Sequence, residues 1–159
     1  MGNLIVNRVD LNNPIVVDNL RKAIGKLAQT PSNYYPLKFK PSYYFEVPTG
    51  GMPSESGWYI VLEGKSPLYV GKADDLDKRL NTNNGSTDNF GKKERSSDAE
   101  RNFIKKFAEL NILSNLRVCI IREKDVCSEL NINANALTDL DRGNVEKIIN
   151  IFGHYFNYL

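Results

Sequence analysis

The stretch GWYIVLEGKSPLYVGKADDLDKRL, residues 57–80, decides the fold. Its first part, residues 58–62, is rich in aromatic and β-branched side chains and predicts a β-strand. Residues 66–71 predict a second strand, and Gly64 lies at the turn between the two. A short glycine-containing turn between two such runs is typical of a β-hairpin.

The pairing within this hairpin depends on the length of its turn. If Gly64 is the centre of a three-residue loop, Tyr59 faces Tyr69 and their hydroxyls lie side by side on one face of the sheet. Gly57 then faces Gly71 at the open end, where glycines let a backbone or a ligand approach closely. The tyrosine pair alone is also typical of an ordinary aromatic pair that stabilises a sheet.

Beyond the hairpin, a short helix is expected at residues 74–80, with Asp74 as its N-cap. Residues 81–97 are polar and predict a surface loop. The capping-box pattern of residues 97–100 opens a further helix. Residues 116–121 are almost continuously apolar, which predicts a central strand.

Both ends of the chain predict helices. Residues 141–152 have apolar side chains at helical spacing, whereas residues 125–139 are ambiguous. An amphipathic helix is expected at residues 14–29, followed by a proline-rich loop at 30–42 and a short edge strand at 43–47. The whole pattern predicts an α+β fold, in which a small sheet of about three strands, opened by the hairpin, is flanked by helices. An N-terminal extension, residues 1–50, precedes the main domain, residues 51–159.

Composition excludes several classes of protein. A hydrophobic fraction of 41% and a charged fraction of 25% are ordinary for a soluble globular domain. No long apolar run or signal peptide is found, so we expect a cytoplasmic protein. Two cysteines are too few for a disulfide scaffold, and we expect Cys119 to be a core thiol. The single histidine, His154, excludes a His/Cys zinc cluster, and we expect it to be a surface or packing residue.

Residues spread over the chain match one known pattern. G-W-Y at residues 57–59, Y-V-G-K at residues 69–72 and Arg79 are followed much later by Glu146 and Asn157. This order resembles the GIY-YIG nuclease family. The hairpin and helix are similar to those of the incision subunit of bacterial nucleotide-excision repair, and the N-terminal helix loosely resembles the opening of GIY-YIG restriction endonucleases.

The resemblance implies a divalent-metal-dependent endonuclease that hydrolyses DNA. Glu146 would be the metal ligand for Mg²⁺ or Mn²⁺, and Asn157 would brace the site by hydrogen bonds. Mg²⁺ often takes only one or two carboxylates, so a single glutamate is chemically reasonable. Arg79 would stabilise the transition state, because a guanidinium suits a phosphate oxygen. Read in isolation, Glu146 is more typical of a solvated residue near the start of a helix, and Asn157 could equally be a structural cap.

Tyr69 is the candidate general base, because the only histidine is not well placed for that role. A free tyrosine has a pKa of about 10, so the base needs help at neutral pH. Lys72 would lower the pKa of Tyr69 by favouring the phenolate, and Tyr59 would donate a hydrogen bond to it. One departure from the family is Asn83, which stands where members often carry a Tyr or His.

The substrate partner is expected to be DNA, held by basic residues that would contact its phosphates. These candidate DNA-binding residues are Lys92, Lys93, Arg95, Arg101 and Lys105. A restriction enzyme would form a homodimer, because two strands need two active sites. The chain would be a compact stand-alone enzyme or a fragment. The alternative function, favoured by Asn83 and a net charge of only +2, is a nucleic-acid-binding module with little catalysis.

Overall fold

The protein is known from a computed structural model that describes residues 8–40, 44–47, 51–80 and 115–159. Its centre is a four-stranded antiparallel sheet with the order β1-β6-β4-β5. The strands of this sheet are β1 (Tyr34–Pro36), β4 (Gly57–Glu63), β5 (Ser66–Ala73) and β6 (Leu116–Arg122). A separate two-stranded sheet consists of β2 (Lys38–Lys40) and β3 (Tyr44–Glu46).

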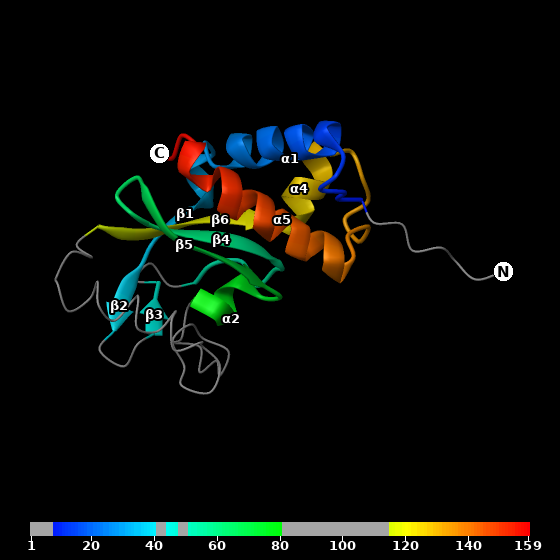
Figure 1. Cartoon of the computed structure of the whole chain (residues 1–159). Helices are drawn as coiled ribbons and strands as arrows, with labels where there is room; N and C mark the ends of the chain where they lie inside the picture. Colours follow the sequence, from blue (N-terminus) through cyan, green and yellow to red (C-terminus); the bar gives the residue numbers. More distant parts are fainter. Residues whose placement is uncertain (1–7, 41–43, 48–50, 81–114) are drawn as a thin grey trace.

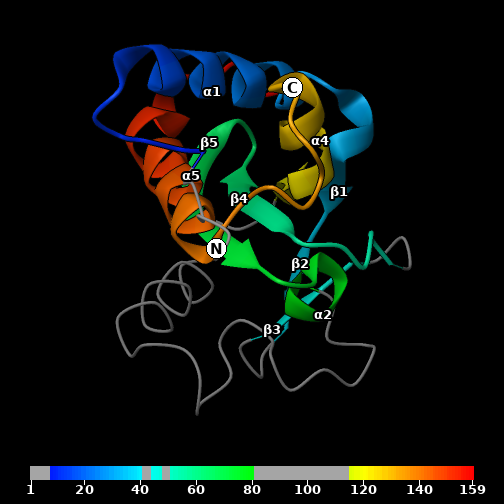
Figure 2. The ribbon, with the colours of Figure 1, turned by 90° about the vertical axis from the view of Figure 1, so that its right-hand side faces the viewer.

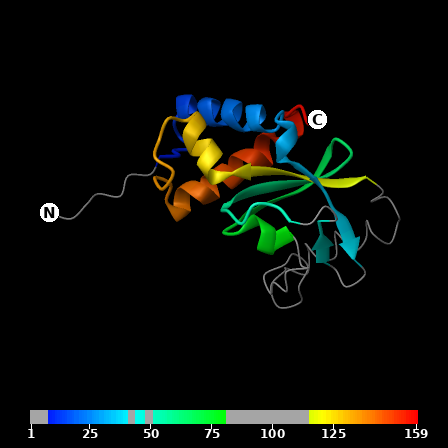
Figure 3. The same ribbon diagram turned by 180° about the vertical axis from the view of Figure 1, so that it is seen from behind.

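The helices divide between the two sides of the sheet (Figure 1). They are α1 (Pro14–Leu27), α2 (Leu76–Leu80), α4 (Glu123–Glu129) and α5 (Asp139–Phe152), with 3₁₀ turns η1 (Pro31–Asn33) and η3 (Gly153–Tyr155). Helices α1, α4 and α5 cover one face, while α2 and the β2–β3 pair lie beyond the other face (Figures 2 and 3).

Alternation along β4 builds a core on each face of the sheet. Trp58, Ile60 and Leu62 belong to the core that α1, α4 and α5 cover. Tyr59 and Val61 point to the opposite face, where they pack with residues of α2 and β6. One strand therefore supplies both cores, which explains why β4 reads as continuously apolar.

The predicted α+β class is confirmed, and so is the central position of residues 116–121, since β6 lies between β1 and β4. The sheet has four strands rather than about three, because β1, inside the stretch predicted as a loop, pairs with β6. The expected edge strand at 43–47 is β3 of the smaller sheet. Part of the ambiguous stretch 125–139 belongs to α4. The loop and helix expected at 81–110 lie outside the described residues.

The predicted register of the hairpin is wrong. Tyr59 pairs with Gly71 and Gly57 pairs with Ala73, while Tyr69 faces Val61. An irregularity between Val61 and Leu62 shifts the register, and the pairing of Glu63 with Ser66 leaves a two-residue turn. Gly64 occupies that turn with φ +61°, a conformation that side chains disfavour.

The N-terminal helix is part of the same core as the main sheet. Leu20, Ile24 and Leu27 of α1 pack in one cluster with residues of β4 and α5. The backbone N–H of Val9 donates a hydrogen bond to Asp141 at the start of α5. In the described residues, every helix is too short or too polar to cross a membrane.

Candidate active site at the edge hairpin

Tyr59 and Tyr69 share the face of the sheet opposite α5. Because Tyr69 lies two residues from the partner of Tyr59, the rings are diagonal neighbours rather than directly opposed. Their centroids are 6.1 Å apart with a tilt of 33° between the rings. The two tyrosine rings are therefore neighbours, as predicted, but through a different register of the hairpin.

Gly71 makes the position of the Tyr59 ring possible. A Cβ at residue 71 would lie 2.2 Å from Cζ and 2.3 Å from the hydroxyl oxygen of Tyr59. The ring thus crosses β5 where this strand has no side chain. Gly57 serves a different contact, since a Cβ there would lie 2.3 Å from the carbonyl oxygen of Ile121 on β6.

Helix α2 brings Arg79 to the end of the Tyr59 ring. The Nε of Arg79 donates a hydrogen bond of 3.3 Å to the hydroxyl oxygen of Tyr59. Asp75, rather than the predicted Asp74, caps this helix by accepting from the N–H of Lys78. Asp77 is buried and accepts a hydrogen bond from the N–H of Met52, which ties α2 to the segment before β4.

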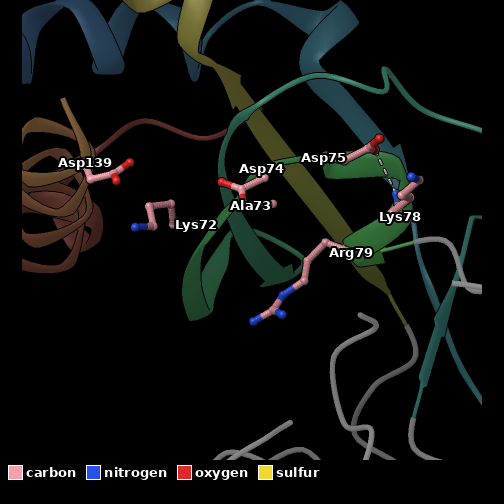
Figure 4. A pocket seen from close by; sticks show the side chains of 7 residues that line it. All are labelled: Lys72, Ala73, Asp74, Asp75, Lys78, Arg79 and Asp139. Carbon is pink, nitrogen blue, oxygen red and sulfur yellow. Dashed lines mark hydrogen bonds between the residues drawn. The ribbon is translucent and has the colours of Figure 1, made fainter. Parts of the chain in front are cut away.

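A hollow of about 610 Å³ opens beside Arg79 (Figure 4). Lys72 enters it from the end of β5, Arg79 from α2, and Asp139 from the first turn of α5. Its lining consists of Lys72, Ala73, Asp74, Asp75, Lys78, Arg79 and Asp139. Two residues of the predicted site, Lys72 and Arg79, therefore line one cavity.

Lys72 and Tyr69 belong to opposite faces of β5. Lys72 pairs with Trp58, whose side chain lies on the face covered by α5, whereas Tyr69 shares the face of Tyr59. This register gives no support to the hypothesis that Lys72 acts directly on the Tyr69 phenol. It favours instead a role for Lys72 in the larger hollow.

Glu146 is half-buried on the part of α5 that runs beside β5. Ile149 and Asn150 follow it by three and four residues, so they share its side of the helix. Both line a second hollow of about 80 Å³ against residues 67–70 of β5. Asp139, two turns before Glu146, lines the larger hollow. Glu146 thus lies along α5 between the two hollows, whereas the rings of Tyr59 and Tyr69 belong to the other face of the sheet. A phosphate bound by both groups would have to lie at the edge of β5, where the two faces meet.

The start of α5 is fixed by a partly buried ion pair. Glu123 of α4 accepts hydrogen bonds from Nε and, at 3.2 Å, from Nη2 of Arg142. This hydrogen bonding raises the pKa of the Arg142 guanidinium above its ordinary value. The indole N–H of Trp58 donates to the carbonyl oxygen of Arg142 at 3.0 Å. These contacts hold α5 against β4 and α4, and so position Asp139 and Glu146 relative to the hairpin.

Asn157 and His154 lie at the other end of α5. Asn157 is exposed and lines neither hollow described here. Its neighbours Phe156 and Tyr158 pack against each other and into the core under α1. His154 is exposed, as expected for a surface residue, but it also lines the smaller hollow. Neither His154 nor Asp139 is marked in the sequence as a lining residue, because the placement of both depends on how α5 packs along β5.

A magnesium site in the described residues would depend on a single carboxylate. In the ranges that the structure describes, no group of three or more His, Cys, Asp or Glu side chains could hold a metal. Glu146 offers a hard carboxylate oxygen beside the hairpin, and Mg²⁺ commonly completes its shell with water and substrate phosphate. Such a site would bind the ion weakly until substrate is present.

The remaining candidate residues lie outside the described part of the chain. These are Asn83 and the basic residues Lys92, Lys93, Arg95, Arg101 and Lys105. Cys119 is buried, and burial raises the pKa of its thiol to about 12, which agrees with the expected core role.

The fold and site together define a small α+β protein with a tyrosine–arginine cluster at an edge hairpin. No protein-family model, curated protein or solved structure matches the chain.

Proposed function

We propose that the protein is a divalent-metal-dependent endonuclease that hydrolyses DNA phosphodiester bonds. The observation that carries the proposal is the hydrogen bond from Arg79 to Tyr59, with Tyr69 beside it and Lys72 lining the same hollow as Arg79. The two phenols do not line the hollow, but Tyr59 is hydrogen-bonded to an arginine that does. A phenol linked in this way to a cation at a cavity suits a reaction that moves a proton while charge builds up on phosphate.

The proposed reaction is attack of water on phosphorus. A new P–O bond forms as the bond to the leaving oxygen of the strand breaks. Tyr69, as its phenolate, takes the proton of the attacking water, and solvent water supplies the proton that the leaving oxygen gains. Arg79 binds a phosphate oxygen through its guanidinium, which points into the hollow in Figure 4. Tyr59 orients Arg79 through their hydrogen bond. A Mg²⁺ or Mn²⁺ ion on Glu146 would supply positive charge at the phosphate.

One observation favours the alternative function, a nucleic-acid-binding module with little catalysis. Asp74, Asp75 and Asp139 line the larger hollow together with three cations, so its lining carries no net positive charge. Carboxylates near a phosphate weaken its binding by like-charge repulsion. A protein of this kind would bind nucleic acid without cutting it.

Nicking of supercoiled plasmid separates the two functions. Wild-type protein with Mg²⁺ is compared with the same protein in EDTA and with Glu146→Gln, which keeps the size of the side chain. Glu129→Gln is the matched control, because Glu129 is a helix carboxylate on α4 that pairs with Lys26 of α1, away from the lining of both hollows beside β5.

We expect nicking by wild type and Glu129→Gln in Mg²⁺, and a loss of at least about 100-fold in EDTA and in Glu146→Gln. Nicking that survives in EDTA, or that Glu146→Gln leaves unchanged, would contradict a metal-dependent reaction at this site. DNA binding with no cleavage in either Mg²⁺ or Mn²⁺ would favour the alternative.

A further inference from the structure

The larger hollow is lined by charges of both signs: Asp139 lies on the α5 side, while Asp74 and Asp75 lie with the three cations on the side of β5 and α2. Lys72 and Arg79 approach from β5 and α2, and Asp139 approaches from α5 (Figure 4). Within the described ranges, no ion pair joins Lys72 to Asp139, although both line the same cavity. The two charges are therefore separated by open space rather than closed onto each other. A ligand for this hollow needs an anionic group at one end and hydrogen-bond donors at the other.

The Asp139 side chain is exposed and has one ion-pair partner. Its Oδ1 accepts a hydrogen bond of 2.9 Å from Nη1 of Arg142, which is itself fixed by Glu123. Glu123 is almost fully buried and also accepts a hydrogen bond from the hydroxyl of Ser56. A carboxylate can accept further hydrogen bonds on both oxygens. Asp139 is thus an exposed acceptor, hydrogen-bonded on one side to Arg142, whose remaining capacity is open to a ligand.

A nucleotide meets both requirements. Its phosphate suits Lys72 and Arg79, and N–H groups on its base suit the carboxylate of Asp139. The volume of about 610 Å³ lies within the range of small-ligand sites, about 300–1,000 Å³. Among the bases, guanine presents an imino and an amino donor side by side, which matches the two oxygens of a carboxylate. Thymine presents one imino donor between two carbonyl oxygens, and these oxygens would repel the carboxylate of Asp139.

We propose that this hollow binds one unpaired nucleotide of the DNA strand and that Asp139 determines a preference for guanine. That the ligand is DNA rests on the proposed function. That the hollow binds a phosphate at one side and a base at the other rests on the positions of its charged side chains. A base that uses its Watson–Crick edge must be outside a duplex. The substrate class is therefore DNA with a single-stranded or extruded nucleotide.

Binding of short single strands tests the proposal without cleavage. Fluorescence anisotropy in EDTA compares three labelled strands of equal length: all thymidine, thymidine with one central guanosine, and thymidine with one central inosine. Inosine lacks only the amino group of guanosine. We expect wild type to bind the guanosine strand on the order of tenfold more tightly than the other two, as for a bidentate contact to a base.

Two variants separate a specific contact from bulk charge. Asp139→Asn should remove the preference for guanosine, because an amide cannot accept on both atoms. Asp74→Asn is the matched control, since Asp74 is an exposed carboxylate of the same hollow on the wall opposite α5. It should keep the preference. Circular dichroism checks that both variants fold.

Equal binding of all three strands by wild type, or no binding of any, would overturn the proposal. Loss of the preference in Asp74→Asn as well as in Asp139→Asn would also overturn it, because charge alone would then explain the effect. Plasmid nicking without a guanosine preference leaves the proposed function standing and removes this inference. A guanosine preference without nicking does the reverse.

Discussion

Two neighbouring aromatic residues of β4 show how the faces of the sheet differ. Trp58 and Tyr59 are both fully buried, and the polar end of each has a hydrogen-bond partner. The partner of Trp58 is the backbone carbonyl of Arg142 beneath the helices. The partner of Tyr59 is the side chain of Arg79, which lines a hollow. The partner of Trp58 thus lies in a closed core, whereas the partner of Tyr59 lies at a cavity.

The largest effect on stability is expected from Trp58→Ala. This substitution leaves a cavity between β4 and α5 and removes the donor to the Arg142 carbonyl. The free energy of unfolding should fall by about 3–5 kcal/mol, the usual cost of truncating a buried aromatic residue. Urea denaturation followed by circular dichroism measures this. A loss below about 1 kcal/mol would mean that the helix-covered face is not the main source of stability.

The opposite face should respond in activity instead. Tyr69→Phe removes only the hydroxyl of the proposed general base, so nicking should fall by about 100-fold or more, equivalent to about 2.7 kcal/mol. Its unfolding free energy should change little, because Tyr69 is only partly buried. Tyr155→Phe is the matched control, since Tyr155 is 81% exposed on η3. Nicking by Tyr69→Phe at the wild-type rate would exclude Tyr69 as the base.

Gly71→Ala should affect both quantities, because Gly71 joins the fold to the site. The new Cβ would displace the Tyr59 ring and so break its hydrogen bond with Arg79. We expect a loss of about 1–3 kcal/mol in stability, the usual cost of overpacking, together with reduced nicking.

Gly143→Ala provides the control for this substitution. Gly143 lies within α5, and a Cβ there would meet no atom within 4 Å. Alanine should raise stability by about 0.5–1 kcal/mol, because it is the better helix former. Equal behaviour of the two alanine variants in denaturation and nicking would show that Gly71 does not position Tyr59.

The sequence predicts the two strands of the hairpin and the placement of Tyr59 and Tyr69 on one face of the sheet, but not the register of the strands. Apolar and aromatic runs predict where β4 and β5 lie, because those side chains need two buried faces. The irregularity between Val61 and Leu62 has no signal in the sequence. The two-residue turn at Gly64 shifts the pairing by one residue relative to a three-residue loop. The irregularity shifts it by one more, which places Tyr59 and Tyr69 on the same face of the sheet.

Long-range placement was less predictable than local structure. β1 is only three residues long and pairs with β6, more than 80 residues further on, so no local pattern predicts it. Asp139 reaches the larger hollow only because α5 begins at that residue and packs along β5. The helix was predicted to begin at Asp141. The true cap, Thr138, pairs with an aspartate, where a capping box usually has Glu or Gln.

The smallest expected loss of stability, from Asp141→Asn, concerns this helix start and depends on pH. Burial opposes ionisation of Asp141, but hydrogen bonds from the N–H groups of Thr138 and Val9 hold the pKa of its carboxyl below the ordinary value of 3.8. A carboxyl whose pKa is lower in the folded state stabilises the protein above its unfolded pKa, and this contribution disappears as pH falls through the folded pKa. Wild type should therefore exceed Asp141→Asn in unfolding free energy by about 1–2 kcal/mol at pH 7, a difference that shrinks below about pH 4. Urea denaturation of both proteins across this pH range measures the difference. A gap that stays constant into acid would show that the charge of Asp141 does not hold the N-terminal segment to α5, and that shape and neutral hydrogen bonds suffice there.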